Sequence, residues 1–337
     1  MKELSKCNLC PLKCNVDRNN GMLGRCRAGK KIKIALASLH FYEEPCISGE
    51  SGSGTVFFTG CNLSCVFCQN YEVSQNYKGE EIDIEKLADT FLDLQNKKAN
   101  NINLVTGFMF APHIVEAVKI AKEKGLKIPI VYNSSGYESV DTIKMLEGTV
   151  DVYLPDFKYY YDELGEKYSG VKNYFENSTE AIKEMIRQKG APRFDENGLI
   201  KKGVIIRHLI LPNHIRNTKR VLKYIKDNFG KETYVSIMAQ YFPTNRANEY
   251  EEINRKISKE EYESIEEYIE ILGLENGYMQ DFTEEDESKY VPNFYAKKIR
   301  GIFPSDNNYS IINKLIMQVI NLYEKIEKKK KKRVKIW

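Results

Sequence analysis

Three cysteines stand close together in one short segment of the chain. They are Cys61, Cys65 and Cys68, at the spacing C-x3-C-x2-C. Thiolates are soft ligands that suit iron–sulfur clusters, zinc or Cu(I), and a closed zinc site or a cubane cluster normally takes four protein ligands. Three thiols therefore leave one corner of a cluster open to an outside chelating ligand. A zinc knuckle that borrows a fourth ligand, or unligated core thiols, are the alternatives.

Four further cysteines precede this loop, in a stretch rich in proline, asparagine and glycine. They are Cys7, Cys10, Cys14 and Cys26, at the spacing C-x2-C-x3-C-x11-C. Four thiols suit a closed tetrahedral site, and a short segment with almost no apolar core needs such a staple. Zinc, rubredoxin-like iron and an auxiliary [4Fe–4S] cluster fit this ligand count equally well, and free thiols are the alternative. The eighth cysteine, Cys46, is predicted to pack in the core.

The elements that position the three-cysteine loop follow from an alternation of short apolar runs and amphipathic stretches. The expected strands are Gly54–Phe58, Asn101–Val105, Lys127–Tyr132, Asp151–Leu154, Val204–Leu211 and Tyr234–Met238. The expected helices between them are Asp83–Asn96, Ala111–Lys124, Val140–Glu147, Thr179–Gln188 and Thr218–Asn228. About six strand–helix units imply a parallel sheet, and strands that are apolar throughout are buried on both faces. Because Cys61 follows the first strand closely, its loop is expected at the carboxyl end of the sheet, where α/β folds keep their sites.

The length of 337 residues allows two domains, or one α/β barrel with additions. We divide the chain into a cysteine-rich metal-binding segment (residues 1–50), a barrel (residues 51–275) and a C-terminal extension (residues 276–337). Beyond the sheet, one helix is expected at Lys259–Leu272. The extension is expected to hold a further helix at about Ile311–Lys328 and to end in a polylysine tail.

Composition and charge exclude several classes of protein. Hydrophobic residues make up 42% of the chain, which is enough to bury a sizeable core and excludes a disordered protein. Lys328–Lys332, Arg333 and Lys335 supply seven positive charges, and without them the net charge of +4 becomes negative. The body of the chain is therefore not a basic nucleic-acid binder. The tail is predicted to be a solvated, disordered end, with a contact to an acidic partner or RNA as the alternative.

A cytoplasmic protein without membrane contact is expected. No apolar run reaches the roughly 18–20 residues that span a bilayer, and the first residues do not resemble a signal peptide. Disulfides are rare in a reducing compartment, so eight cysteines that all precede residue 69 indicate metal. No G-x-G-x-x-G follows an expected strand, which argues against a dinucleotide-binding fold.

The segment Thr59–Asn70 closely resembles the signature of the radical S-adenosylmethionine (SAM) superfamily, including the aromatic Phe67 just before the third cysteine. The resemblance implies a partial (β/α)6 barrel, TIM-like in type, with the N-terminal cysteine-rich segment and a C-terminal helical extension added to it. It also implies that Cys61, Cys65 and Cys68 hold a catalytic [4Fe–4S] cluster whose open iron binds the amino and carboxylate groups of SAM. The reduced cluster would cleave SAM to methionine and a 5′-deoxyadenosyl radical, which abstracts hydrogen from the substrate.

Within that superfamily the chain most resembles the pyruvate formate-lyase-activating-enzyme-like proteins. The phrases that carry this likeness are Leu39–Gly49, Gly54–Cys61, Tyr132–Tyr137, Leu154–Tyr159, Ile206–Pro212 and Met238–Tyr241. The likeness implies an oxidoreductase that activates a protein substrate, a glycyl-radical enzyme, with flavodoxin or ferredoxin as electron donor. Modification of a peptide or small molecule with an auxiliary cluster is an alternative, and so is a non-catalytic zinc and iron–sulfur binding protein.

Polar residues at or near the ends of the other expected strands are candidate SAM contacts. They are Thr106, Gly107, Asn133, Ser135, Asp156, Lys158, Arg207 and Gln240. Asp156 and Lys158 would point to the same side of an extended chain, and in the activating enzymes the matching Asp-x-Lys phrase lies against the methionyl carboxylate. A structural ion pair at a loop is the alternative for these two residues. Arg207 interrupts an apolar strand, where a buried guanidinium needs an anion. The SAM carboxylate or an acidic neighbour such as Asp156 would serve.

The chain departs from these relatives after the second expected strand. The relatives usually continue Thr-Pro-Thr-His, whereas this chain has Thr106-Gly-Phe-Met109. The histidine of the relatives therefore has no counterpart at this point. His113 lies nearby and is predicted to be an ordinary residue at the start of a helix, with a role as ligand or base as the alternative.

Overall fold

The computed structural model describes residues 1–282, 294 and 334–336. Its sheet has six consecutive parallel strands at the centre. These are β2 (Ser53–Phe58), β4 (Ile102–Val105), β5 (Ile130–Ser134), β6 (Val152–Pro155), β8 (Ile200–Leu209) and β9 (Tyr234–Met238). They correspond to the six expected strands in the expected order, which confirms the α/β fold and the partial barrel.

Further strands extend this sheet at both sides. At one side β1 (Ile32–His40) runs antiparallel to β2 and also pairs with β3 (Glu80–Ile82). At the other side β10 (Gly277–Gln280) runs parallel to β9. The short β7 (Arg193–Phe194) pairs with the start of β8. The nine-residue β1 lies inside residues 1–50, so the sheet begins earlier in the chain than residue 51.

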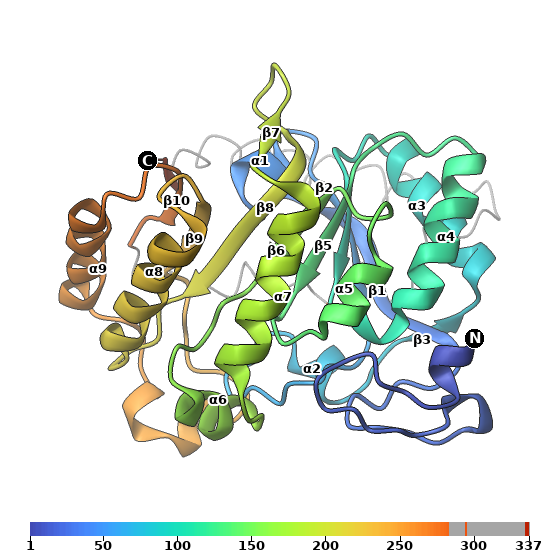
Figure 1. Ribbon diagram of the computed structural model, residues 1–337, viewed down its shortest axis with the longest axis horizontal. Coiled ribbons are helices and arrows are strands. Elements are labelled where there is room, and N and C mark those ends of the chain that lie inside the picture. The colour runs from blue at the N-terminus through green and yellow to red at the C-terminus, as the bar shows by residue number, and fades with distance from the viewer. Residues whose placement is uncertain (283–293, 295–333, 337) are drawn as a thin grey trace, which may run out of the picture.

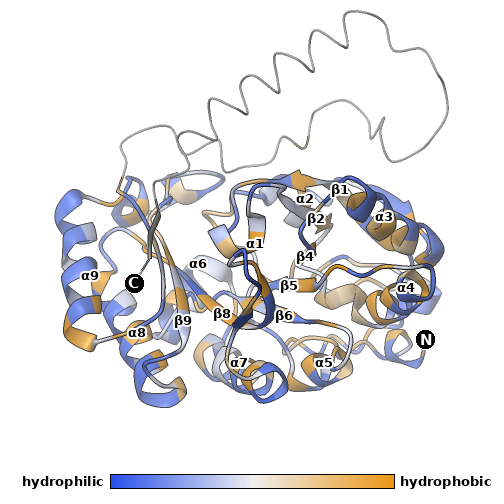
Figure 2. Cartoon of the chain, turned by 90° about the horizontal axis from the view of Figure 1, so that it is seen from above, coloured by the Kyte–Doolittle hydropathy of each residue, from blue (hydrophilic) through white to orange (hydrophobic). Residues whose placement is uncertain are grey.

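Helices cover the outside of the sheet (Figures 1 and 2). They are α3 (Ile84–Asn96), α4 (Ala111–Glu123), α5 (Val140–Met145), α6 (Asp162–Ser169), α7 (Tyr174–Lys189), α8 (Ile215–Phe229) and α9 (Lys259–Leu272). The shorter α1 (Pro45–Ser48) lies inside the curve of the strands in Figure 2, and α2 (Tyr71–Ser74) follows the three-cysteine loop. The helix α9 begins where expected because Ser258 and Glu261 form a capping box at its first turn.

Local hydrogen bonds explain where the expected boundaries were wrong. The strand β5 starts at Ile130 instead of Lys127, because the backbone N–H groups of Lys127 and Ile128 donate to the Gln95 side chain. The strand β8 starts at Ile200 instead of Val204, since its first residues pair with β7. A partner from another segment, a side chain for β5 and a strand for β8, thus moves a strand end by several residues.

Two apolar layers pack on the two faces of the sheet. The larger one fills the space between the strands and the outer helices. The smaller one lies inside the barrel, where Cys46 and Ile47 of α1 pack on Val131 of β5, Leu154 of β6 and Ile205 of β8. Cys46 is buried there, as predicted.

The C-terminal predictions fall mostly outside the described residues. The helix expected at about residues 311–328 and residues 328–333 of the polybasic tail lie there. The three described residues Val334–Ile336 form β11, which pairs antiparallel with β10. For these three residues the prediction of a solvated end is wrong, because the edge of β10 offers unpaired backbone groups to a strand. In the part of the chain that is described, no helix is both long and apolar enough to cross a bilayer.

Candidate functional site

The three-cysteine loop leaves the end of β2 at the carboxyl side of the sheet, which faces downward in Figure 1. Gly60 has a φ of +100°, and a Cβ there would overlap the backbone carbonyl of Cys26. Only glycine lets the chain turn this close to the N-terminal segment. The turn brings Cys61 next to that segment and directs the loop across the strand ends.

Each of the three thiols has a hydrogen-bonding neighbour. The Ser169 hydroxyl lies 3.0 Å from Cys65 Sγ, and the Ser74 hydroxyl lies 3.2 Å from Cys68 Sγ. The backbone N–H of Leu63 donates to Cys61 Sγ over 3.4 Å. These donors suit sulfur atoms that carry negative charge, because such hydrogen bonds stabilise thiolates and the clusters bound to them.

Burial keeps the free thiols neutral. It raises the pKa of Cys61 and Cys65, and raises the pKa of Cys68 to about 11, with Cys65 contributing to the shift. The Lys158 ammonium acts in the opposite direction on the pKa of all three thiols. A metal centre must therefore displace protons when it binds here. Three thiols, one buried and two half-buried, with a hydrogen-bonding neighbour on each sulfur fit a cubane cluster with one open corner.

Neither the three cysteines of this loop nor the four N-terminal cysteines are arranged to hold a single metal ion. Across residues 1–282 and the few described residues beyond them, no set of three or more His, Cys, Asp or Glu side chains has that arrangement. A cubane cluster binds its thiolates at separate corners and needs them more widely spaced.

Four of the predicted SAM contacts form one polar group beside the loop. Asp156 receives Lys158 Nζ at 2.5 Å on one carboxylate oxygen and Arg207 Nε at 3.0 Å on the other. Arg207 Nη2 also donates to Asn133 Oδ1 over 2.9 Å. These residues come from the ends of β5, β6 and β8, which are neighbours in the sheet. The buried arginine thus has the acidic partner that its place in the strand required.

Each charged residue in this polar group stabilises the charged form of its neighbours. Burial by itself would raise the pKa of Asp156, but Lys158 and Arg207 bring it below its usual value. Burial would likewise lower the pKa of Lys158, and the charge of Asp156 raises it instead. Both groups are therefore charged at neutral pH. The ammonium lies between the carboxylate and the cysteine loop.

Sequence reasoning missed two acids that complete this group. Glu43 Oε2 lies 3.3 Å from Arg207 Nη1, and Glu44 is buried beside the same guanidinium. Both precede α1 and reach Arg207 from inside the barrel. They lie in the Leu39–Gly49 phrase that resembles the activating enzymes, and two adjacent acids in an apolar context were the only signal. Charge compensation across such a distance in sequence cannot be read from the chain.

The turn after β5 is fixed by Tyr174, which sequence reasoning also missed. Its hydroxyl lies 3.0 Å from the Ser135 carbonyl and 3.1 Å from the Asp156 carbonyl, and accepts from the Lys158 N–H at 3.0 Å. Gly136 has a φ of +80°, and a Cβ there would overlap the Asp156 carbonyl. The Ser135 hydroxyl is buried and has no hydrogen-bond partner among the described residues.

The remaining predicted contacts lie around this group. Thr106 has a φ of +56°, which is rare for a β-branched residue, and its N–H donates to the Asn133 carbonyl over 2.9 Å. Gly107 packs so closely that a Cβ would lie 2.7 Å from Ile114 Cδ1. The Gln240 carbonyl accepts from Gln69 Nε2 at 3.2 Å, which joins the end of β9 to the cysteine loop. All the predicted contacts thus lie at the carboxyl ends of the strands.

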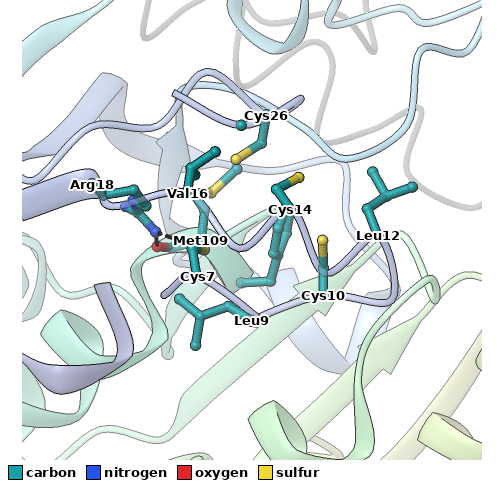
Figure 3. A pocket seen from close by; sticks show the side chains of 11 residues that line it. Cys7, Leu9, Cys10, Leu12, Cys14, Val16, Arg18, Cys26 and Met109 are labelled. Carbon is teal, nitrogen blue, oxygen red and sulfur yellow. Dashed lines mark hydrogen bonds between the residues drawn. The ribbon is translucent and has the colours of Figure 1, made fainter. Parts of the chain in front are cut away.

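The N-terminal cysteines form a second group. Cys7, Cys10, Cys14 and Cys26 line one pocket together with Arg18, Phe108 and Met109 (Figure 3). The residues after Thr106, where the chain departs from its relatives, therefore pack on the N-terminal segment. His113 is the third residue of α4, where its Nε2 lies 3.0 Å from the Lys30 carbonyl. Burial lowers the pKa of His113 to about 4, so it is an uncharged packing residue of the helix start.

Comparison with known proteins places the chain in a family. A family model described as "Radical SAM superfamily" matches residues 55–193. An uncharacterized protein of Methanocaldococcus jannaschii is 35% identical over 276 residues, which cover 80% of this chain and 75% of that protein. This chain belongs to the radical SAM superfamily. Membership of the radical SAM superfamily implies a [4Fe–4S] cluster and SAM as its cofactors.

More distant matches were also found. The pyruvate formate-lyase-activating enzyme of Clostridium pasteurianum is 25% identical over 246 residues, or 67% of this radical SAM chain and 93% of that enzyme. SuiB of Streptococcus suis bound to S-adenosylmethionine matches with a TM-score of 0.44 and 13% identity, over 66% of this chain and 48% of SuiB. The hydrogenase maturase HydG of Carboxydothermus hydrogenoformans has a TM-score of 0.45 and 14% identity, over 69% and 54%. The chain spans about half the length of these two solved structures.

Proposed function

We propose that this chain cleaves SAM reductively and abstracts hydrogen from a protein, in the manner of glycyl-radical enzyme activation. The observation that carries the proposal is one juxtaposition. Cys61, Cys65 and Cys68 lie at the end of β2, and the Asp156–Lys158–Arg207 group lies beside them at the ends of β6 and β8. A soft-ligand site with an open corner then adjoins groups that bind a carboxylate.

The three cysteines would hold the cluster, which supplies the electron that cleaves bound SAM to methionine and a 5′-deoxyadenosyl radical. The Lys158 ammonium, held by Asp156, offers its charge to the carboxylate of the methionyl part. Arg207 is fixed by Asp156 and Asn133, so it keeps the carboxylate of Asp156 in place. The role of these residues is to orient SAM at the open corner before the electron arrives.

Other residues would shield the site or complete it. Phe67 lies between the last two cysteines and packs on Tyr241 with ring centroids 5.7 Å apart, which keeps water from that side of the loop. The backbone groups of Thr106 and Gly107 would contact the SAM ammonium. The Ser135 hydroxyl would contact the SAM carboxylate or ribose. Gln240 is offered to the adenosine part. The free Ser135 hydroxyl and the strained Thr106 support a ligand here.

A protein substrate is supported by the match to the pyruvate formate-lyase-activating enzyme, because it covers 93% of that protein. Flavodoxin or ferredoxin would supply the electron. The four-cysteine pocket favours a second candidate, in which a peptide or small molecule is modified with the help of an auxiliary cluster. The two candidates share the same first step and differ in the acceptor of the radical.

The first step is tested by 5′-deoxyadenosine formation. The anaerobically reconstituted protein is incubated with SAM and dithionite, and the product is measured by chromatography. We expect product from the native protein and from Cys46→Ala, a buried cysteine outside both thiol groups, and none from Cys65→Ala. No product from native protein that holds about four irons at this site would overturn the proposal.

The second step is tested with a glycyl-radical enzyme encoded in the same genome. We expect its glycyl radical to appear by electron paramagnetic resonance (EPR) only when SAM, dithionite and this chain are all present. If SAM is cleaved but no glycyl radical forms, the protein-activation part is wrong and the auxiliary-cluster candidate replaces it.

A further inference from the structure

We propose that Cys7, Cys10, Cys14 and Cys26 bind a second iron–sulfur cluster, with the buried Arg18 as its counterion. This goes beyond the cleavage of SAM in the proposed function, which uses only the other three cysteines. The ligand count alone allows zinc or a cluster. The buried charge calls for an anionic centre, and the pocket and the surroundings of the thiols favour the cluster.

The four thiols line a pocket instead of meeting at one point (Figure 3). The pocket has room for about one water molecule, a volume of about 10 Å³. Four thiolates on one zinc ion would each lie at about 2.3 Å from it and would leave no such space. The rest of the lining is mostly apolar and includes Leu9, Leu12, Val16, Phe108 and Met109. An apolar shell of this kind limits solvent access to a metal centre and controls its potential.

The backbone of the N-terminal segment is shaped around this pocket. Cys7 and Val16 are joined by a backbone hydrogen bond of 3.0 Å, which closes a loop that carries the first three thiols. Gly24 lets the returning chain approach, because a Cβ there would lie 3.0 Å from Cys14 Sγ. Cys26 then completes the set from the other side. The backbone therefore brings the four thiols to one pocket.

Arg18 is the observation that points to an anionic ligand. Its side chain is 1% exposed, and its guanidinium donates to the carbonyls of Gly29 (2.7 Å) and Met109 (2.6 Å). It also lies 3.8 Å from Cys7 Sγ. No carboxylate forms an ion pair with it in the described part of the chain. A buried guanidinium without an anion is costly, and a cluster held by four thiolates supplies the negative charge.

The pocket also adjoins the catalytic loop. The Cys26 carbonyl lies directly against Gly60, and Arg25 Nη2 donates to the Ser64 hydroxyl over 3.0 Å. Phe108 and Met109 of the lining follow Thr106 in the chain. The second cluster would therefore lie next to the loop that carries the first.

The test removes the catalytic ligands and counts what remains. The variant Cys61→Ala/Cys65→Ala/Cys68→Ala is reconstituted anaerobically and analysed for iron, sulfide and zinc. We expect about four irons and four sulfides per chain, with a cubane signature by Mössbauer spectroscopy. One zinc without iron, or no metal, would show that the proposal is wrong. SAM cleavage is measured separately on the native protein, so failure here is distinguishable from failure of the proposed function.

If the triple variant does not fold, the iron content of the native protein tests the proposal. It should hold about eight irons per chain, and Cys10→Ser/Cys14→Ser should hold about four and keep the SAM-responsive EPR signal. About four irons and one zinc in the native protein would overturn the proposal.

The counterion is tested by Arg18→Met in the same triple variant. Loss of the positive charge should shift the reduction potential of the remaining cluster to a more negative value. The exposed Arg216→Met is the matched control and should leave the potential unchanged. Equal reduction potentials in the Arg18→Met and Arg216→Met variants would show that Arg18 is not the counterion of the cluster.

Discussion

Serine hydroxyl groups beside the cysteine thiols can adjust the reduction potential of the catalytic centre. Ser169 lies between Cys65 Sγ (3.0 Å) and the Tyr159 hydroxyl (2.8 Å). When Cys65 is a thiolate it can only accept, so Ser169 donates to it and Tyr159 donates to Ser169. Such a chain of hydrogen bonds spreads the negative charge of the sulfur. Ser74 does the same for Cys68.

We expect Ser169→Ala to make the reduction potential of the catalytic cluster more negative. The lost hydrogen bond stabilised the reduced state, which carries more negative charge on sulfur. An EPR-monitored redox titration measures the shift. Ser264→Ala is the control, because its hydroxyl accepts a hydrogen bond from Lys219 between the helices α8 and α9. An unchanged potential in Ser169→Ala would contradict the role of this donor.

Glu138 should make the stability of the protein depend on pH. Burial raises its pKa to about 8, against partial compensation by Ser134, from the usual value of 4.5. The folded state therefore holds a proton that the unfolded chain has released. Its contribution to stability is complete below about pH 4.5 and is lost as the pH rises toward 8, at up to about 1.4 kcal/mol per pH unit.

We expect Glu138→Gln to remove this decline in stability with rising pH. The midpoint of thermal unfolding is measured for both proteins between about pH 5 and 8. The native protein should lose stability with rising pH more steeply than the variant, since glutamine has no proton to release. Parallel curves would show that Glu138 is not the group responsible.

At the scale of elements, the turns after the strands decide whether the polar residues meet. The turn after β5 passes directly over the Asp156 carbonyl at the end of β6, and Tyr174 at the start of α7 holds both strand ends. A strand end, its turn and a helix start from another unit thus form one support. The position of Asp156 depends on this support as much as on its own strand.

We expect Gly136→Ala to weaken SAM binding and to destabilise the protein. Gly148→Ala is the matched control, because both glycines have a positive φ but a Cβ at Gly148 meets nothing within 4 Å. The control should cost about 1–2 kcal/mol from backbone strain, and Gly136→Ala on the order of 2 kcal/mol more from overlap. Chemical denaturation and equilibrium SAM binding measure the two effects. Equal losses in both variants would show that the close approach is unimportant.

At the scale of the whole molecule, the inner core of the barrel depends on a segment that lies outside the strand–helix repeat. The short helix α1 joins β1 to β2 and places Ile47 on the inner faces of β5, β6 and β8. The preceding residues, Glu43 and Glu44, are carried to Arg207 by the same connection. One segment therefore fills the barrel interior and neutralises its buried arginine.

We expect Ile47→Ala to cost about 2–5 kcal/mol, because it leaves a cavity in the inner core. Ile271→Ala is the control, since Ile271 on α9 is 77% exposed, and it should change stability by no more than about 0.5 kcal/mol. Chemical denaturation of both variants measures the difference. Similar values would mean that α1 does not fill the barrel.

The sequence by itself determined the features that depend on neighbours along the chain. Cys61, Cys65 and Cys68 are recognisable because their spacing is local, and the six parallel strands because an apolar run between helices can be buried in few ways. The helix α9 was predicted to the residue, since its capping box is local too. The long β1 was missed, because a strand at the start of the chain has no strand–helix pattern around it.

Only the tertiary structure decided which distant groups meet. Glu43 meets Arg207, Ser169 meets Cys65 and Arg18 meets the Met109 carbonyl through packing that the sequence does not encode locally. The physical reason is that buried charges and thiols require partners, but the chain satisfies them from whichever segment the fold brings near. Spacing shows which residues need a partner, and only the packed molecule shows which partner they have.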